Sequence, residues 1–145
     1  MRFSRKLAWC ILALVVVPSF AWAKDVTLAD WAEKTVRDGL VKPLSQQEGR
    51  RFSRERPPPQ ERRVRVLAVG PTTDKSGNEF VPFAIDQRYP GSAWNENSIV
   101  GCVYRKTGYL FVKIGEEYRP SSFLFGKNVG PVKGVCEAAP PPAKA

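Results

Sequence analysis

The sequence predicts a mainly β protein of the α+β class: an N-terminal amphipathic helix with a small antiparallel β-sheet or partly open β-barrel, closed by one disulfide. Three observations predict it. Apolar side chains recur at helical spacing from position 28 to 40. Short extended patterns follow one another from position 64 at intervals of about 10–15 residues. Two cysteines, Cys102 and Cys136, enclose the last part of these patterns.

Residues 1–23 have the layout of a secretory signal peptide. Basic residues open it, an apolar run follows over 7–17, and Ala21-Trp22-Ala23 places small residues at the two positions that signal peptidase reads. We expect a mature chain that starts at Lys24 and is exported, to the periplasm or the extracellular medium. After cleavage no transmembrane span would remain. An uncleaved anchor is the alternative, because the run up to Ala23 holds 17 mostly apolar residues, at the lower limit of a membrane span.

The positive charge is concentrated in one segment. The chain has 23 basic and 14 acidic residues, and loss of the leader would leave 20 against 14, a net charge of +6. Seven arginines between positions 50 and 65, set against Glu55 and Glu61, give that segment a local charge of +5. The rest of the mature chain is therefore close to neutral.

The N-terminal helix is assigned to residues 24–44. Thr27 followed by Asp30 has the spacing of a capping box. Proline lacks an N–H and cannot continue a helix, so Pro43 is expected to end it near Val41. The apolar face at helical spacing consists of Leu28, Trp31, Ala32, Val36 and Leu40.

Residues 45–63 are interpreted as an exposed, basic, Pro-rich connector. Phe52 is their only large apolar side chain, and three consecutive prolines at 57–59 favour an extended conformation. A small β domain is assigned to 64–136 and a disordered, Pro-rich tail to 137–145. The strands expected within the β domain cover 64–69, 80–87, 99–105, 109–114 and 123–125.

Two local features of the β domain are predicted as well. Residues 106–108 between two of its strands fit a type I turn with Gly108 in the left-handed conformation. Residues 74–78 place oxygen-bearing side chains at alternate positions but lack the glycine and glutamate that a calcium loop requires. An ordinary turn is expected there.

Cysteine usage predicts one disulfide. Cys10 would leave with the leader, so Cys102 and Cys136 have one pairing available in an oxidising compartment. A closed loop of about 35 residues stabilises a domain by about 3–4 kcal/mol in the chain-entropy account.

The absence of histidine is the strongest chemical observation. It excludes Ser-His-Asp and Cys-His catalysis and histidine-based zinc sites, and a disulfide would remove the thiolates as metal ligands. We therefore expect a protein that is not an enzyme and holds no metal and no cofactor. A hydrolase that uses carboxylates such as Glu96 or Glu117 is the remaining catalytic alternative.

The arginine segment is a candidate anion-binding site, because guanidinium groups match phosphates, sulfates and carboxylates in bidentate fashion. An anionic envelope polymer or lipid headgroups are the expected partners, a protein is a further candidate, and nucleic acid is not expected for an exported chain. The alternative is that these arginines only keep the connector solvated. The candidates are Arg50, Arg51, Arg54, Arg56, Arg62 and Arg63.

A second candidate is a ligand loop over 89–97, where aromatic side chains stand beside amides. Its residues suit a sugar ring or a peptide, although a loop tryptophan more often fills the end of a core. Tyr104, Tyr109 and Phe111 are expected to pack across strands. The loop candidates are Tyr89, Trp94, Asn95 and Asn97.

These observations together predict an exported, non-enzymatic binding or envelope-associated protein with a weak anionic contact through its arginine segment. The alternative is a secreted inhibitor or accessory protein that acts on an envelope enzyme through a loop of the β domain.

Overall fold

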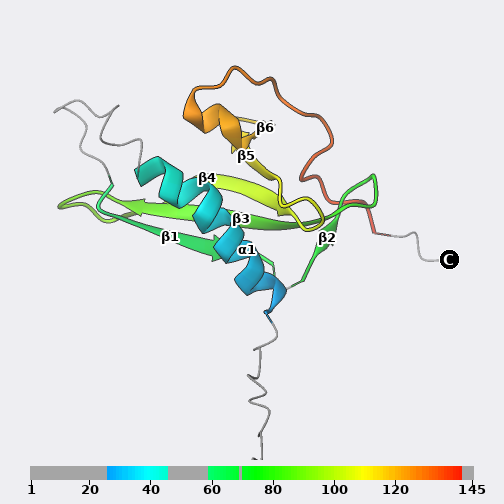
Figure 1. Cartoon of the computed structure of the whole chain (residues 1–145), viewed down its shortest axis with the longest axis horizontal. Coiled ribbons are helices and arrows are strands. Elements are labelled where there is room, and N and C mark those ends of the chain that lie inside the picture. Colours follow the sequence, from blue (N-terminus) through cyan, green and yellow to red (C-terminus); the bar gives the residue numbers. More distant parts are fainter. Residues whose placement is uncertain (1–25, 46–58, 69, 142–145) are drawn as a thin grey trace, which may run out of the picture.

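The computed structural model describes residues 26–45, 59–68 and 70–141 (Figure 1). The predicted leader and four of the candidate arginines (Arg50, Arg51, Arg54 and Arg56) lie outside the described residues. No helix in the described ranges is long and apolar enough to cross a membrane.

Helix α1 (Leu28–Val36) begins as the sequence predicts, with the Thr27 hydroxyl accepting a 3.1 Å hydrogen bond from the backbone N–H of Asp30. The expectation that Pro43 ends the helix near Val41 is wrong, since helical backbone continues to Ser45. A π-helical turn over Arg37–Val41 explains this, because the N–H of the following residue bonds five residues back, to the carbonyl of Arg37. Pro43 follows this turn directly and lies within the continuous helical backbone.

The sheet is open, antiparallel and ordered β1-β3-β4-β5-β6, with the short β2 also paired to β3. This confirms the predicted mainly β class with one helix. Figure 1 shows α1 lying across one face of the sheet. The strands are β1 (Glu61–Val66), β2 (Thr72–Thr73), β3 (Glu79–Arg88), β4 (Trp94–Tyr104), β5 (Leu110–Ile114) and β6 (Glu117–Pro120).

Two strands begin earlier in the chain than predicted. β1 starts at Glu61, so the last three residues of the expected connector belong to the sheet, where Glu61 lies opposite Arg88 and forms an ion pair with it. β4 starts at Trp94, so three of the four expected loop residues lie on a strand. In both cases polar residues are held in the sheet by cross-strand partners.

The last predicted strand is wrong. Residues 123–125 belong to a 3-10 helix, η2 (Ser121–Phe125), which ends at Gly126 in the left-handed conformation. The last strand of the sheet, β6, lies just before η2, because Gly115, with φ +63°, turns the chain directly from β5 into β6. The turn between β4 and β5 is as predicted, with Gly108 at φ +70°.

The main core lies between α1 and one face of the sheet, and the helix stripe is buried there as predicted. A smaller cluster occupies the opposite face of the sheet, where Phe80, Cys102 and Tyr104 pack with Phe111 and Val135. The main core consists of Ala32, Val36, Leu40, Val64, Val81, Phe83, Ile85, Val103 and Val112.

The C-terminal segment is tied back to the sheet at two places. Cys102 of β4 and Cys136 form the predicted disulfide, with their Cα atoms 5.9 Å apart. Beyond it, the N–H of Ala139 donates to the carbonyl of Thr73, and Ala138 forms a β-bridge with Asp74. The first residues of the expected disordered tail are therefore paired with the sheet, because β2 offers them an open edge.

Candidate functional site

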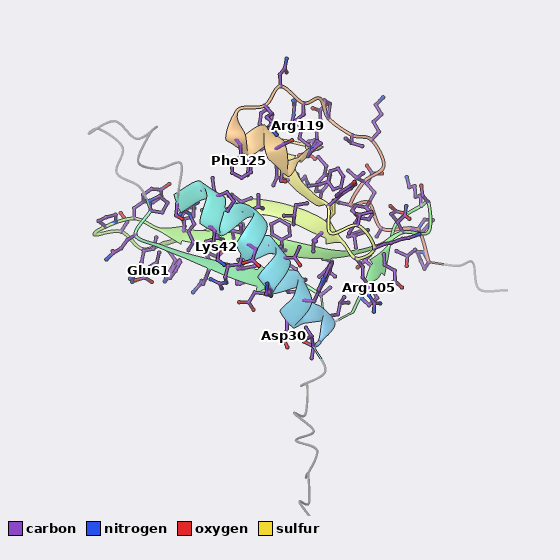
Figure 2. The ribbon with its side chains drawn as sticks, in the orientation of Figure 1. Asp30, Lys42, Glu61, Arg105, Arg119 and Phe125 are labelled. Atoms are coloured by element: carbon purple, nitrogen blue, oxygen red, sulfur yellow. A yellow bond between two sulfur atoms is a disulfide. The ribbon has the colours of Figure 1, made fainter. Side chains whose placement is uncertain are left out.

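A cluster of arginines and one tryptophan occupies the sheet face that α1 leaves open. Side chains alternate between the two faces of a strand, so Asp86 lies opposite to the buried Ile85. In the β1–β3 register Arg63 stands directly across from Asp86. One end of the open face therefore carries charged groups in place of apolar ones, near the labelled Glu61 in Figure 2.

Asp86 is the centre of this cluster. Its side chain is fully buried, and one oxygen, Oδ2, accepts hydrogen bonds from the Nε atoms of both Arg63 and Arg65, each at 2.6 Å. The other oxygen, Oδ1, accepts from Nη2 of Arg65 at 3.0 Å and from the backbone N–H of Asn97 at 2.9 Å. One buried carboxylate thus fixes two arginines from their inner side.

The protonation states follow from these contacts. The hydrogen bonds from Arg65, with those from Arg63 and the Asn97 N–H, hold the pKa of Asp86 well below its usual range despite burial. The same contact with Asp86 raises the pKa of Arg65. The cluster is therefore a fixed set of charges at neutral pH, and Asp86 is unsuited to act as a general acid.

Trp94 extends the cluster toward the end of the sheet. The guanidinium carbon of Arg63 lies 4.3 Å from its ring centroid and that of Arg88 lies 5.4 Å away, both in cation–π geometry. The interpretation of Trp94 as a core plug is wrong, since it belongs to neither hydrophobic cluster of the described residues. Stacking on arginine explains how a partly buried tryptophan is held there.

A β-bulge brings the Asn97 amide to Asp86. The β3–β4 register shifts between Ile85 and Gln87, and Asn97 takes φ +54°, a left-handed conformation that asparagine tolerates better than most residues. The Asn97 side-chain oxygen also accepts from Nη2 of Arg65 at 2.7 Å.

The structure divides the predicted site residues between the two faces. Arg63, Trp94 and Asn97, predicted in two separate sites, meet around Asp86. Arg62 and Asn95 both stand opposite Gln87 in register, on the helix side of the sheet. Burial lowers the pKa of Arg62.

The fourth residue of the predicted loop also stays on the helix side. The Tyr89 hydroxyl donates to the Gln87 side chain at 3.4 Å, so Tyr89 does not join Trp94. The candidates named from the sequence did not include Arg65, Arg88 or Asp86. A charged residue inside the apolar run of β3 was the signal that could have identified Asp86 as a buried partner of arginines.

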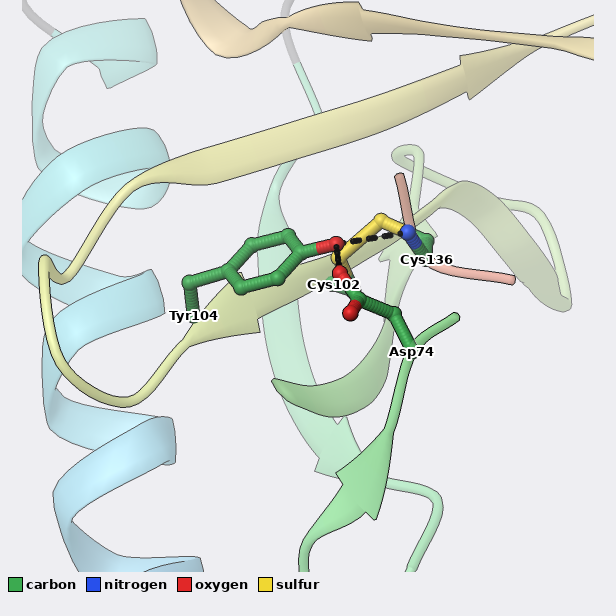
Figure 3. Close-up of a disulfide and its surroundings, with 4 residues drawn as sticks. All are labelled: Asp74, Cys102, Tyr104 and Cys136. Atoms are coloured by element: carbon green, nitrogen blue, oxygen red, sulfur yellow. Dashed lines mark hydrogen bonds between the residues drawn. A yellow bond between two sulfur atoms is a disulfide. The ribbon is translucent and has the colours of Figure 1, made fainter. Parts of the chain in front are cut away.

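The opposite end of the same face is built around Tyr104 (Figure 3). Its hydroxyl donates to Oδ2 of the buried Asp74 at 2.8 Å and accepts from the N–H of Cys136 at 3.0 Å. Oδ1 of Asp74 accepts from the N–H groups of Ser76 and Asn78, each at 2.9 Å, which confirms the predicted turn. Burial raises the pKa of Tyr104.

This network forms the floor of a pocket of about 820 Å³ between the 74–79 turn, the β4–β5 turn and the 133–135 segment. The expectation of cross-strand packing holds for Tyr104 and Phe111, whose ring centroids are 5.6 Å apart in an edge-to-face arrangement. It is wrong for Tyr109, which is 66% exposed at the pocket because its side chain lies beyond the edge of the second cluster.

Among the described residues no group of three or more His, Cys, Asp or Glu side chains is placed to hold a metal ion. Comparisons with protein-family models, curated proteins and solved structures found no significant match to this chain.

Replacing Asp86 with asparagine is expected to lower the free energy of unfolding by about 2 kcal/mol at pH 7. The loss stays below the 3–5 kcal/mol of a fully buried pair because Arg63 and Arg65 are 42% and 39% exposed and regain water. Because the pKa of Asp86 is depressed in the folded state, its contribution is complete above the unfolded pKa of about 3.9 and is lost as the pH falls below it.

Urea unfolding from pH 7 to pH 2 checks this. The difference in the free energy of unfolding between the wild type and D86N should shrink as the pH falls through the acid range. Glu96→Gln is the control, because Glu96 lies 3.6 Å from Arg63 but is 67% exposed, and its loss should leave the stability nearly unchanged. Parallel pH profiles for the wild type and D86N would contradict the assignment.

Proposed function

We propose that the chain is an exported, non-enzymatic binding protein that contacts an anionic partner in the cell envelope through its arginine segment, with β1 as the fixed end of that segment. The observation that carries the proposal is the clamp of Asp86 on Arg63 and Arg65. It orders two guanidinium groups on a sheet face before any partner arrives, which reduces the entropy lost on binding.

The clamp leaves binding capacity on the outer side of both arginines. Asp86 and Asn97 engage Nε and Nη2 of Arg65, and Asp86 engages Nε of Arg63. Neither Nη1 atom has a partner among the described residues. Two such donors, with Trp94 beside them, suit the oxygens of a phosphate, sulfate or carboxylate.

The non-enzymatic part of the proposal rests on the chemistry of the available groups. The most buried carboxylate of the cluster is held ionised by two arginines. Glu96 and Glu117, the residues of the hydrolase alternative, lie on different strands, β4 and β6, and each stands near an arginine, at 3.6 and 3.5 Å.

Removing four arginines tests the proposal. The variant Arg50→Gln, Arg51→Gln, Arg54→Gln, Arg56→Gln should bind heparin and vesicles containing phosphatidylglycerol about a thousandfold more weakly at low salt, since each of its four lost charges contributes about 1 kcal/mol. The heparin arm and the vesicle arm distinguish a polymer from a lipid surface. The matched control replaces four exposed lysines outside the segment and should change retention much less: Lys34, Lys42, Lys113 and Lys127.

Asp86→Asn supplies a second arm, because it removes a negative charge while releasing the clamp. D86N should bind no better than the wild type despite its higher net charge, because Asp86 no longer orders Arg63 and Arg65. Unchanged retention of the four-arginine variant, or an equal loss in the lysine control, would contradict the proposal. Binding that persists in about 500 mM salt, which screens exposed charges, would also contradict it.

A further inference from the structure

We propose that the pocket beside Tyr104 is a second binding site, and that its ligand is an acidic sugar unit. The site lies at the other end of the open face from the arginine cluster, and Figure 2 shows Arg105 at this end and Glu61 at the opposite one. Trp94 and Tyr104 are the two ends of β4, which separates the sites by about 30 Å. The proposal therefore goes beyond the anionic contact of the arginine segment.

The size and floor of the pocket suit a small ligand. Its volume of about 820 Å³ lies within the usual range for ligand sites, about 300–1,000 Å³. The floor is rigid, because the Tyr104 hydroxyl joins Asp74 of the 74–79 turn to the backbone of Cys136, whose disulfide holds the third wall. The 74–79 turn and the 133–135 segment are thus tied to β4 before a ligand arrives.

The charges of the lining select an anion. Arg105 pairs with Glu79 at 3.0 Å, and the carboxylate of Asp74 is occupied by two backbone N–H groups and Tyr104. Lys106 and Lys133 also line the pocket, are exposed, and have no ion-pair partner among the described residues. These two ammonium groups are the charges left to meet a ligand carboxylate.

An aromatic surface beside these lysines selects a ring. Tyr109 lines the pocket with 66% of its surface exposed, although an aromatic side chain normally buries most of its area. Phe111 contributes a second apolar wall, while Ser76, Asn78 and Thr107 offer hydroxyl and amide groups. An aromatic face for the C–H side of a sugar, polar groups for its hydroxyls and two lysines for its acid together fit an acidic saccharide.

Matched sugar pairs test the proposal on the full mature chain. The probes are N-acetylmuramic acid against N-acetylglucosamine, which lacks the carboxylate-bearing lactyl group, and glucuronic acid against glucose. In ¹H–¹⁵N NMR titrations we expect the acidic member of each pair to shift the amides of 106–109 and 133–135, with the neutral member at least tenfold weaker. Equal binding of both members, or shifts confined to other regions, would overturn the proposal.

Variants separate this site from the arginine segment. Lys106→Gln with Lys133→Gln, and Tyr109→Ala alone, should each weaken binding of the acidic sugar about tenfold or more. Lys113→Gln with Lys127→Gln is the charge-matched control outside the pocket and should bind like the wild type. The four-arginine variant should also bind the sugar normally. The sugar titration therefore tests the pocket even if the arginine segment binds no anionic partner. Normal sugar binding by K106Q/K133Q would contradict the assigned role of the lysines.

Discussion

Replacing Gly101 with alanine is expected to destabilise the domain by about 3 kcal/mol or more, at the upper end of what overpacking causes. Gly101 lies in β4, where β5 approaches so closely that a Cβ atom would stand 1.9 Å from the backbone oxygen of Phe111. The same atom would lie 3.0 Å from the ring of Phe83 in the main core. A backbone oxygen in a strand cannot move aside as the end of a flexible side chain can, so the β4–β5 pairing must open.

Gly130→Ala is the matched control, because a Cβ atom there would meet nothing within 4 Å. Urea unfolding followed by circular dichroism should show a large fall in the midpoint for G101A and almost none for G130A. A midpoint of G101A within error of the wild type would contradict the close approach of β4 and β5.

Removal of the disulfide is expected to lower the free energy of unfolding by about 3–4 kcal/mol in the double variant Cys102→Ala, Cys136→Ala. The bond joins residues 34 positions apart, and it holds the 133–135 wall against Tyr104. Small domains have only about 5–15 kcal/mol of stability in total, so the loss should move the urea midpoint strongly.

Reductant provides the control for this prediction. Adding it to the wild type should reproduce the loss, and adding it to the double variant should change nothing. When the disulfide is lost, hydrogen exchange should accelerate first at the backbone N–H groups of position 136 and of Ala139, which the bond holds near β2. A wild type whose stability is insensitive to reductant would contradict a structural role for the bond.

The periodic parts of the fold could be predicted from the sequence. The helix stripe that includes Val36 and Leu40, the turn with Gly108, and the disulfide follow from spacing and residue type alone. Continuation of the helix past Pro43 could not, because a π-helical turn is a change of hydrogen-bond register without a distinct apolar pattern. The apolar run at 123–125 was too short to separate a strand from a helix.

The candidate site was recognised in fragments. Arg63 and Trp94 were singled out, but in different sites, because their meeting depends on the β1–β3–β4 register and on the bulge opposite Asp86. The charged start of β1 resembles a connector until its partner carboxylate, 23 residues later, is known. The pocket beside Tyr104 joins three distant segments, so no local pattern contained it.

The proposed function requires that the chain leaves the reducing cytoplasm, loses its leader and closes its disulfide. The intact mass of the protein isolated from its native cells tests this most directly. We expect a chain that begins at Lys24 and takes up no alkylating reagent until it is reduced, after which Cys102 and Cys136 react. A chain that retains Met1 and has every cysteine open to alkylation without reduction would contradict it.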